Sequence, residues 1–251
     1  MAGPVKGVLF DLGGTLIYFD GDWPDVVKAA NQELLSYLQA LGLQLDPQRF
    51  INEFRVSLEE YYVQRESEFI EYTTARVLRT LLAEMGYPDL DPAILAPALK
   101  KLYAVSQAHW KREEDALPTL QTLRAAGYRM GVISNASDDA DVQTLVENAG
   151  IRGYFDFVLS SAACGIRKPN PYIFEIGLRH WGFDPHQVAM VGDTLGADIL
   201  GARNAGLYSI WITRRADNPG NRDHAGTIQP DAQVHTLAEV PGLLAGRMTP
   251  V

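Results

Sequence analysis

The sequence predicts an α/β fold, in which a parallel sheet is covered by helices on both faces and is interrupted by an inserted helical bundle. Three observations lead to this prediction. A short apolar segment at residues 5–10 ends in Asp11 and a glycine pair, as a buried strand does where it opens onto a functional loop. Residues 19–108 contain no strand pattern, and their apolar residues recur at helical spacing. Beyond this segment strands and helices alternate, which favours a parallel sheet.

Four helices are expected in the inserted segment, and together they would form a small bundle. Apolar residues at helical spacing over residues 27–41 predict the first helix. Asp46–Pro47 predicts the start of the second, because an acidic cap followed by proline is typical of a helix N-terminus. The third is expected over residues 71–86, and Asp91–Pro92 predicts the start of the fourth.

The alternating part completes the predicted sheet. Its elements are expected in this order: helix 118–126, strand 130–134, helix 138–149, strand 157–160, helix 171–181, strand 188–191, helix 195–205 and strand 209–212. Residues 214–230 are polar and rich in turn-forming residues, so a surface loop is expected there.

Composition excludes several classes of protein. The 251 residues carry 31 acidic and 22 basic side chains, a net charge of −9 that disfavours a general nucleic-acid binder. No apolar run approaches the ~20 residues of a membrane span, and the N-terminus lacks the signal-peptide pattern. Cys164 stands alone, so neither an intrachain disulfide nor a cysteine-based zinc site is possible. We therefore expect a cytoplasmic protein without a membrane or nucleic-acid partner; the oligomeric state is left open.

Four polar clusters follow the predicted strands. They contain Asp11, then Ser134 with Asn135, then Lys168, and finally Asp193 and Asp198. Ligands of open α/β sheets bind at the carboxyl ends of the strands, so these side chains are expected to converge. Carboxylates brought together repel one another unless a cation joins them, and Mg²⁺ accepts such an oxygen-rich site. A lysine nearby would hold an anionic, phosphate-like group.

The strings FDLGGTL, VISN, RKPNPYIF and VGDTLGADILGARNAG resemble the four ordered motifs of the haloacid dehalogenase-like (HAD) hydrolase superfamily. The resemblance covers about 160 residues and implies a Rossmann-like core. The helical insertion lies where many members of the superfamily carry a cap domain. It thus implies a core of residues 1–18 and 109–251 and a helical cap of residues 19–108.

The same resemblance implies a catalytic role for two residues. Asp11 would be the nucleophile that forms an aspartyl-phosphate, and Lys168 would screen its carboxylate and stabilise the transition state. Substrate binding is implied for Ser134, Asn135 and Gly14.

A magnesium site is also implied by the resemblance. Its ligands would be the carboxylates of Asp11 and Asp193 and the backbone carbonyl of Gly13, with Asp198 binding through water or supporting the site. The resulting prediction is a Mg²⁺-dependent hydrolase, a phosphatase of small phosphorylated metabolites.

One position departs from the family pattern. Phosphatases that resemble this chain usually have Asp where Gly13 stands, and that Asp protonates the leaving oxygen, a role worth about 10²–10⁴-fold in rate. Asp20 or Asp22 of the insertion is a conceivable substitute. Two alternatives therefore stay open: a phosphate-binding or regulatory protein with weak turnover, and a 2-haloacid dehalogenase. The metal-binding form of the last motif, Gly192 to Asp198, favours phosphate chemistry.

Other residues of the insertion and its flanks are expected to be structural. Three arginines could reach an anionic substrate, but solvated ion pairs are the default expectation for Arg55, Arg65 and Arg76. The aromatic residues expected to pack in the core or cap are Tyr61, Tyr62, Trp110 and Trp181.

Overall fold

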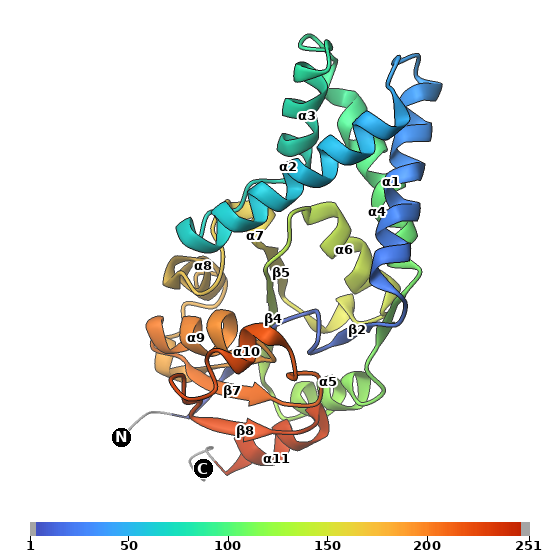
Figure 1. The fold of residues 1–251 in the computed structure, drawn as a ribbon. Coiled ribbons are helices and arrows are strands. Elements are labelled where there is room, and N and C mark those ends of the chain that lie inside the picture. The colour runs from blue at the N-terminus through green and yellow to red at the C-terminus, as the bar shows by residue number, and fades with distance from the viewer. Residues whose placement is uncertain (1–3, 247–251) are drawn as a thin grey trace.

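The computed structural model describes residues 4–246, so residues 1–3 and 247–251 of the predicted core lie outside the described residues. Six strands form one parallel sheet in the order β5-β4-β1-β6-β7-β8 (Figure 1). The strands are β1 (Gly7–Phe10), β4 (Arg129–Ser134), β5 (Phe157–Ser160), β6 (Val188–Gly192), β7 (Tyr208–Ile212) and β8 (Ala232–Val234). The predicted parallel sheet is confirmed, and β1 lies between β4 and β6 near its centre.

The two faces of the sheet are covered by different helices. Val8 and Phe10 of β1 point into one hydrophobic cluster, and Leu9 points into the other, because successive side chains of a strand face opposite ways. The first cluster includes residues of α5 (Ala116–Ala125), α6 (Asp139–Asn148) and α11 (Val240–Ala245). The second includes residues of α8 (Pro171–Leu178) and α9 (Leu200–Asn204).

A bundle of four helices stands beyond the carboxyl edge of the sheet (Figure 1). Its helices are α1 (Trp23–Ala40), α2 (Pro47–Glu68), α3 (Thr74–Glu84) and α4 (Leu95–Gln107). They bury a hydrophobic cluster of their own around Leu34, Phe50 and Phe54. Asp46 caps α2 as expected, whereas α3 begins at Thr74, later than the expected residue 71, because the Thr73 side chain caps it.

Two strands that the sequence analysis did not predict join the helical bundle to the core. β2 (Ile17–Phe19) pairs antiparallel with β3 (Trp110–Arg112), so that Phe19 lies opposite Trp110. Each strand has three residues, too few to show an alternating pattern. The proposed domain boundaries, after residue 18 and before residue 109, fall at this pair. The short edge strand β8 was missed for the same reason.

Short helical turns complete the described structure: η1 (Pro92–Ile94), η2 (Arg152–Tyr154), α7 (Ser161–Cys164), η3 (Pro185–Gln187), η4 (Leu195–Ile199), α10 (Pro219–Arg222) and η5 (Leu237–Glu239). The helix expected over residues 195–205 is divided: η4 is a π-helical turn that carries Asp198, and α9 continues from it. Among the described residues, none of the helices is both long and apolar enough for a membrane span.

Candidate active site

The predicted site residues converge at the carboxyl edge of the sheet, below the helical bundle. Asp11 follows β1, Ser134 ends β4, and Asp193 follows β6. A cavity of about 710 Å³ opens there, and the predicted residues that line it are Asp11, Gly13, Ser134, Asn135, Lys168 and Asp198. The convergence follows from the topology, because neighbouring parallel strands end at the same edge.

Lys168 lies at the centre of this group with its ammonium buried. Its Nζ is 2.6 Å from Oδ1 of Asp11 and 2.7 Å from Oδ1 of Asp198, and it donates to the Ile133 carbonyl at 2.7 Å. Burial lowers the pKa of Lys168, but the carboxylates of Asp11 and Asp198 outweigh that effect and hold the pKa above its usual value. The lysine therefore stays charged beside Asp11.

The loop that carries Lys168 is fixed to the loop after β4. Asn135 accepts from the Lys168 backbone N–H at 2.8 Å and donates from Nδ2 to the Lys168 carbonyl at 2.9 Å. The peptide bond between Lys168 and Pro169 is cis. Since the Asn135 side chain is used in this way, the substrate contact predicted for this residue would come from its backbone.

Three carboxylates form an acidic cluster at the same place. Ligand oxygens of Asp11, Asp193 and Asp198 lie within 4.8 Å of one another. Burial, opposed by Lys168 and reinforced by Asp198, raises the pKa of Asp11 to about 6. Burial and repulsion from Asp11 and Asp198 raise the pKa of Asp193 to about 8. Lys168 alone therefore does not keep all three carboxyl groups of the cluster in the charged form.

The cluster fits a hard divalent cation. Its donors are all oxygen atoms, the type that Mg²⁺ prefers. A cation would relieve the repulsion that adds to burial in raising the pKa of Asp193. Asp198 is oriented by the Thr194 backbone N–H, which donates to Oδ2 at 2.9 Å, and the Thr194 hydroxyl donates to Oδ1 of Asp193 at 3.2 Å.

Gly14 has a conformational reason to be glycine. Its φ is +80°, and a Cβ at this position would meet Oδ2 of Asp193 at 2.6 Å. Its N–H donates to the Ile17 carbonyl at 2.7 Å. These contacts let Asp193 approach the turn after β1, while the substrate-binding role of Gly14 stays a prediction.

The space beside Gly13 is occupied by an aromatic ring. A Cβ at Gly13 would meet Cη2 of Trp110 at 3.3 Å and Cζ3 at 3.5 Å. Trp110 packs against the core, as expected, and it also lines the cavity. Pairing of β2 with β3 brings Trp110 here, and the sequence analysis could not find it because those strands gave no signal.

An aspartate and a histidine are among the cavity residues that were not singled out from the sequence. Asp141, in the first turn of α6, and His224 both line the cavity. Burial raises the pKa of Asp141 to about 6, opposed by a hydrogen bond from Gln107 and reinforced by the charge of Asp138. Acidic residues are common in the first turn of a helix, so the sequence offered no reason to assign Asp141 a functional role.

Of the candidate residues in the insertion, Arg65 lines the cavity, and Asp20 and Asp22 do not. Asp20 and Asp22 are exposed, and Asp22 caps α1 by accepting from the Asp25 N–H, so neither is in position to replace the missing acid. Arg65 lines the cavity and lies over the Tyr62 ring.

The other two arginines of the insertion have local partners. Arg55 forms an exposed ion pair with Glu59, as expected. Arg76 lies over the Tyr72 ring, with 4.4 Å between its Cζ and the ring centroid.

The chain is similar to a known family of hydrolases. The family model described as haloacid dehalogenase-like hydrolase matches residues 5–206. A glyceraldehyde 3-phosphate phosphatase from Methanopyrus kandleri is 30% identical over 214 residues, which are 84% of each chain. A ribulose-1,5-bisphosphate 5-phosphatase from Halopiger xanaduensis is 29% identical and is matched over 95% of this chain and 98% of its own length.

Solved structures show the same fold. A 2-haloacid dehalogenase from Pseudomonas syringae pv. Tomato superposes with a TM-score of 0.68 at 28% identity, over 96% of this chain and 99% of that one. A HAD phosphatase from Thermococcus onnurineus gives a TM-score of 0.65 at 24% identity, over 98% and 100% of the two chains.

Proposed function

The chain belongs to the haloacid dehalogenase-like hydrolases, and we propose that it is a Mg²⁺-dependent phosphatase of small phosphorylated metabolites. One observation carries the proposal: the buried Lys168 ammonium lies between Asp11 and Asp198, with Asp193 beside them, at the base of one cavity. That arrangement offers a nucleophile, a fixed cation and an oxygen-rich metal site together.

In the proposed reaction the Asp11 carboxylate attacks phosphorus, and the bond between phosphorus and the ester oxygen breaks. The leaving oxygen takes up a proton from water, and Asp11 carries the phosphoryl group. Water then attacks phosphorus, which releases inorganic phosphate and restores the Asp11 carboxylate. Lys168 holds Asp11 in place and stabilises negative charge as it builds up on the phosphoryl oxygens.

Asp11, Asp193 and Asp198, with the Gly13 carbonyl, would hold the Mg²⁺ ion. When bound, the ion supplies positive charge that offsets both the carboxylates and the phosphoryl oxygens. Ser134 and Asn135 line the cavity, and in the proposed reaction Ser134 and the Asn135 backbone would bind the phosphoryl oxygens.

The substrate class is proposed from the cavity and the relatives. A volume of about 710 Å³ accommodates a small metabolite below the helical bundle, which we propose to be a cap. Relatives named as phosphatases of glyceraldehyde 3-phosphate and ribulose 1,5-bisphosphate favour short sugar phosphates. Because Gly13 has no proton to donate, leaving groups that need little protonation should react fastest.

A panel of phosphate esters tests the proposal. Phosphate release is measured with Mg²⁺ and with EDTA for wild type, for Asp11→Asn, and for Asp20→Asn as a control that alters an exposed carboxylate outside the cavity. We expect Mg²⁺-dependent release that Asp11→Asn abolishes and Asp20→Asn preserves. Equal release by wild type and Asp11→Asn would overturn the proposal.

A 2-haloacid dehalogenase is the second candidate. Gly13 in place of the phosphatase Asp and the similarity to the P. syringae 2-haloacid dehalogenase favour it. Halide release from a 2-chloroacid in EDTA, retained in Asp193→Ala, would support this candidate, because that chemistry needs no metal. Asp193 beside Asp11 and Asp198 favours the phosphatase instead.

A further inference from the structure

The segment between α2 and α3 lies against two loops of the core. Its backbone bonds to the loop before Lys168: the Glu71 N–H donates to the Gly165 carbonyl at 2.9 Å, and the Arg167 N–H donates to the Phe69 carbonyl at 3.0 Å. Its end bonds to the loop after β4, where the Thr74 N–H donates to the Ser137 carbonyl at 2.9 Å. This segment of the helical bundle thus contacts both the loop that carries the predicted catalytic Lys168 and the loop that carries the predicted substrate-binding Asn135.

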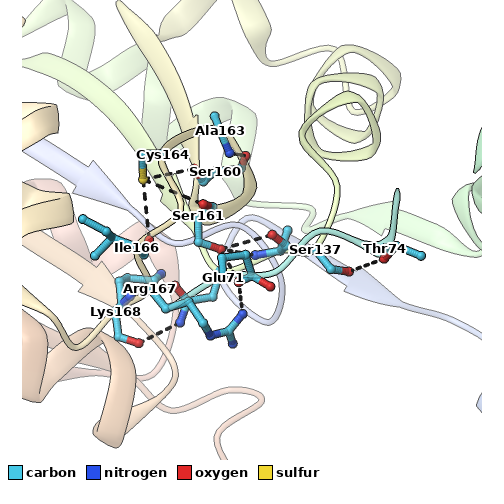
Figure 2. A network of polar contacts seen from close by, with 12 residues as sticks. Glu71, Thr74, Ser137, Ser160, Ser161, Ala163, Cys164, Ile166, Arg167 and Lys168 are labelled. Atoms are coloured by element: carbon cyan, nitrogen blue, oxygen red, sulfur yellow. Dashed lines mark hydrogen bonds and ion pairs between the residues drawn. The ribbon is translucent and has the colours of Figure 1, made fainter. Parts of the chain in front are cut away.

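The Glu71 side chain joins the two loops through one oxygen (Figure 2). It is 5% exposed, and its Oε2 forms an ion pair with Arg167 and accepts from the Ser161 hydroxyl at 2.6 Å. Ser161 Oγ in turn accepts from the Ala136 N–H at 2.9 Å. Figure 2 shows Glu71 between Arg167 and Ser161. Glu71 therefore contacts Arg167, which precedes Lys168 in the chain. Through Ser161 it is also linked to Ala136, which follows Asn135.

The contacts of Glu71 and Phe69 include features that lower the stability of the folded protein. Oε1 of Glu71 is buried without a hydrogen-bond partner, and a buried ion pair is weak evidence for stability because of its desolvation cost. Phe69 has φ of 53°, the left-handed region that bulky residues avoid, and its carbonyl is held by the Arg167 N–H. Phe69 and Arg167 also line the cavity. The strained backbone at Phe69 and the buried ion pair of Glu71 with Arg167 thus lie at the wall of the cavity. Their position favours a functional role for this contact.

We propose that Glu71 is a positioning residue, which acts through Arg167 and Ser161 to hold the Lys168 and Asn135 loops in their reactive geometry when the helical bundle is seated on the core. This inference rests on the proposed function of the same site. Arg167 is neutralised by Glu71, so Lys168 is left as the cation at Asp11. A displacement of about 1 Å at a reacting group can cost about 10²-fold in rate, so loss of the contact should lower kcat more than it weakens binding.

The test compares Glu71→Gln with Glu68→Gln, a control that changes an exposed glutamate at the end of α2. Backbone amide exchange is measured at Ala136 and Arg167 by NMR, which needs no substrate. We expect exchange at both amides to rise about tenfold or more in Glu71→Gln and to stay at the wild-type rate in Glu68→Gln. Unchanged exchange at both amides would overturn the positioning role, even if the protein has no phosphatase activity.

Kinetics supply the second readout. With an active wild type, we expect Glu71→Gln to lower kcat by about tenfold to a hundredfold with KM nearly unchanged. A wild-type kcat would overturn the inference, whereas a wild type that hydrolyses no ester would overturn the proposed function alone.

A second variant covers the case in which Glu71→Gln does not fold. Ser161→Ala removes the hydrogen bonds that the Ser161 hydroxyl makes with Glu71 and with Ala136, and it does not alter either partner of the ion pair between Glu71 and Arg167. We expect faster amide exchange at Ala136 and a reduced kcat. Wild-type values of both would contradict the coupling through Ser161.

Discussion

Lys168 is a buried cation held by three oxygen atoms, two of them in carboxylates. Burial and repulsion from Asp11 and Asp198 raise the pKa of Asp193, so this ammonium alone does not keep all three carboxyl groups charged. A neutral side chain at position 168 would leave buried carboxylates without a partner. At the scale of residues, the site therefore depends on a balance of charge more than on any single hydrogen bond.

Lys168→Met should abolish turnover and lower the free energy of unfolding in EDTA by about 3–5 kcal/mol, because Asp11 and Asp198 lose their counter-ion. Urea unfolding measures the change, and Lys101→Met, at an exposed lysine of α4, is the control. Added Mg²⁺ should restore part of the lost stability. An unchanged unfolding free energy in EDTA would show that the ion pairs contribute nothing to the fold.

Gly13→Asp should not raise phosphatase activity, because its side chain would enter the space that the Trp110 ring fills. Overpacking should instead cost about 1–3 kcal/mol of stability. Initial rates for esters with poor leaving groups measure the effect, with Gly13→Asn as the variant of equal shape that lacks the acid. A gain of about 10²-fold or more in Gly13→Asp alone would show that the site is a degenerate phosphatase with weak turnover.

At the scale of elements, the strands that lead into the site could be predicted from the sequence, and the contacts between elements could not. Residues 157–160 form β5 as expected, since a short apolar run between turn signals is a local pattern. The placement of Trp110 against Gly13 depends on three-residue strands and on pairing across 90 residues of helices. The ion pair of Glu71 with Arg167 also joins residues far apart in the chain, so no local sequence pattern could predict it.

The packing of α6 against α4 contains a titratable contact. Gln107 at the end of α4 donates to Oδ1 of Asp141 at 2.8 Å, and Asp138 is the charged neighbour that reinforces the effect of burial on the pKa of Asp141. Since the folded-state pKa of about 6 exceeds the ordinary 3.8, the folded protein binds this proton more tightly than the unfolded chain does. The stability that the proton contributes is present below about pH 4 and is lost as pH rises to about 6.

Asp141→Asn should remove this pH dependence. Between pH 4 and pH 7, wild type should lose about 2 kcal/mol more than the variant, as measured by urea unfolding in EDTA. Asp89→Asn, at an exposed carboxyl in the turn after α3, serves as the control and should behave as wild type. Parallel pH profiles for wild type and Asp141→Asn would contradict the assignment.

At the scale of the whole molecule, a chain with a net charge of −9 has a cavity in which we propose that a phosphorylated substrate binds. The acidity lies mainly in the inserted segment, where residues 19–108 hold 14 acidic and 8 basic side chains. The cavity is lined by basic residues of both the helical bundle and the core, together with acidic residues of the core: Arg65, Arg167, Lys168, Asp11, Asp141 and Asp198. The sheet with its covering helices and the helical bundle bury separate hydrophobic clusters. The cavity of the candidate active site is lined by residues of both.

The covalent step tests the central claim most directly. Wild type and Asp11→Asn are mixed with a ³²P-labelled phosphate ester in Mg²⁺, quenched in acid within milliseconds, and digested for peptide analysis. We expect label on the peptide that contains Asp11 in wild type, and neither label nor phosphate release in Asp11→Asn. Phosphate release by Asp11→Asn at the wild-type rate, with no label on that peptide in wild type, would contradict it.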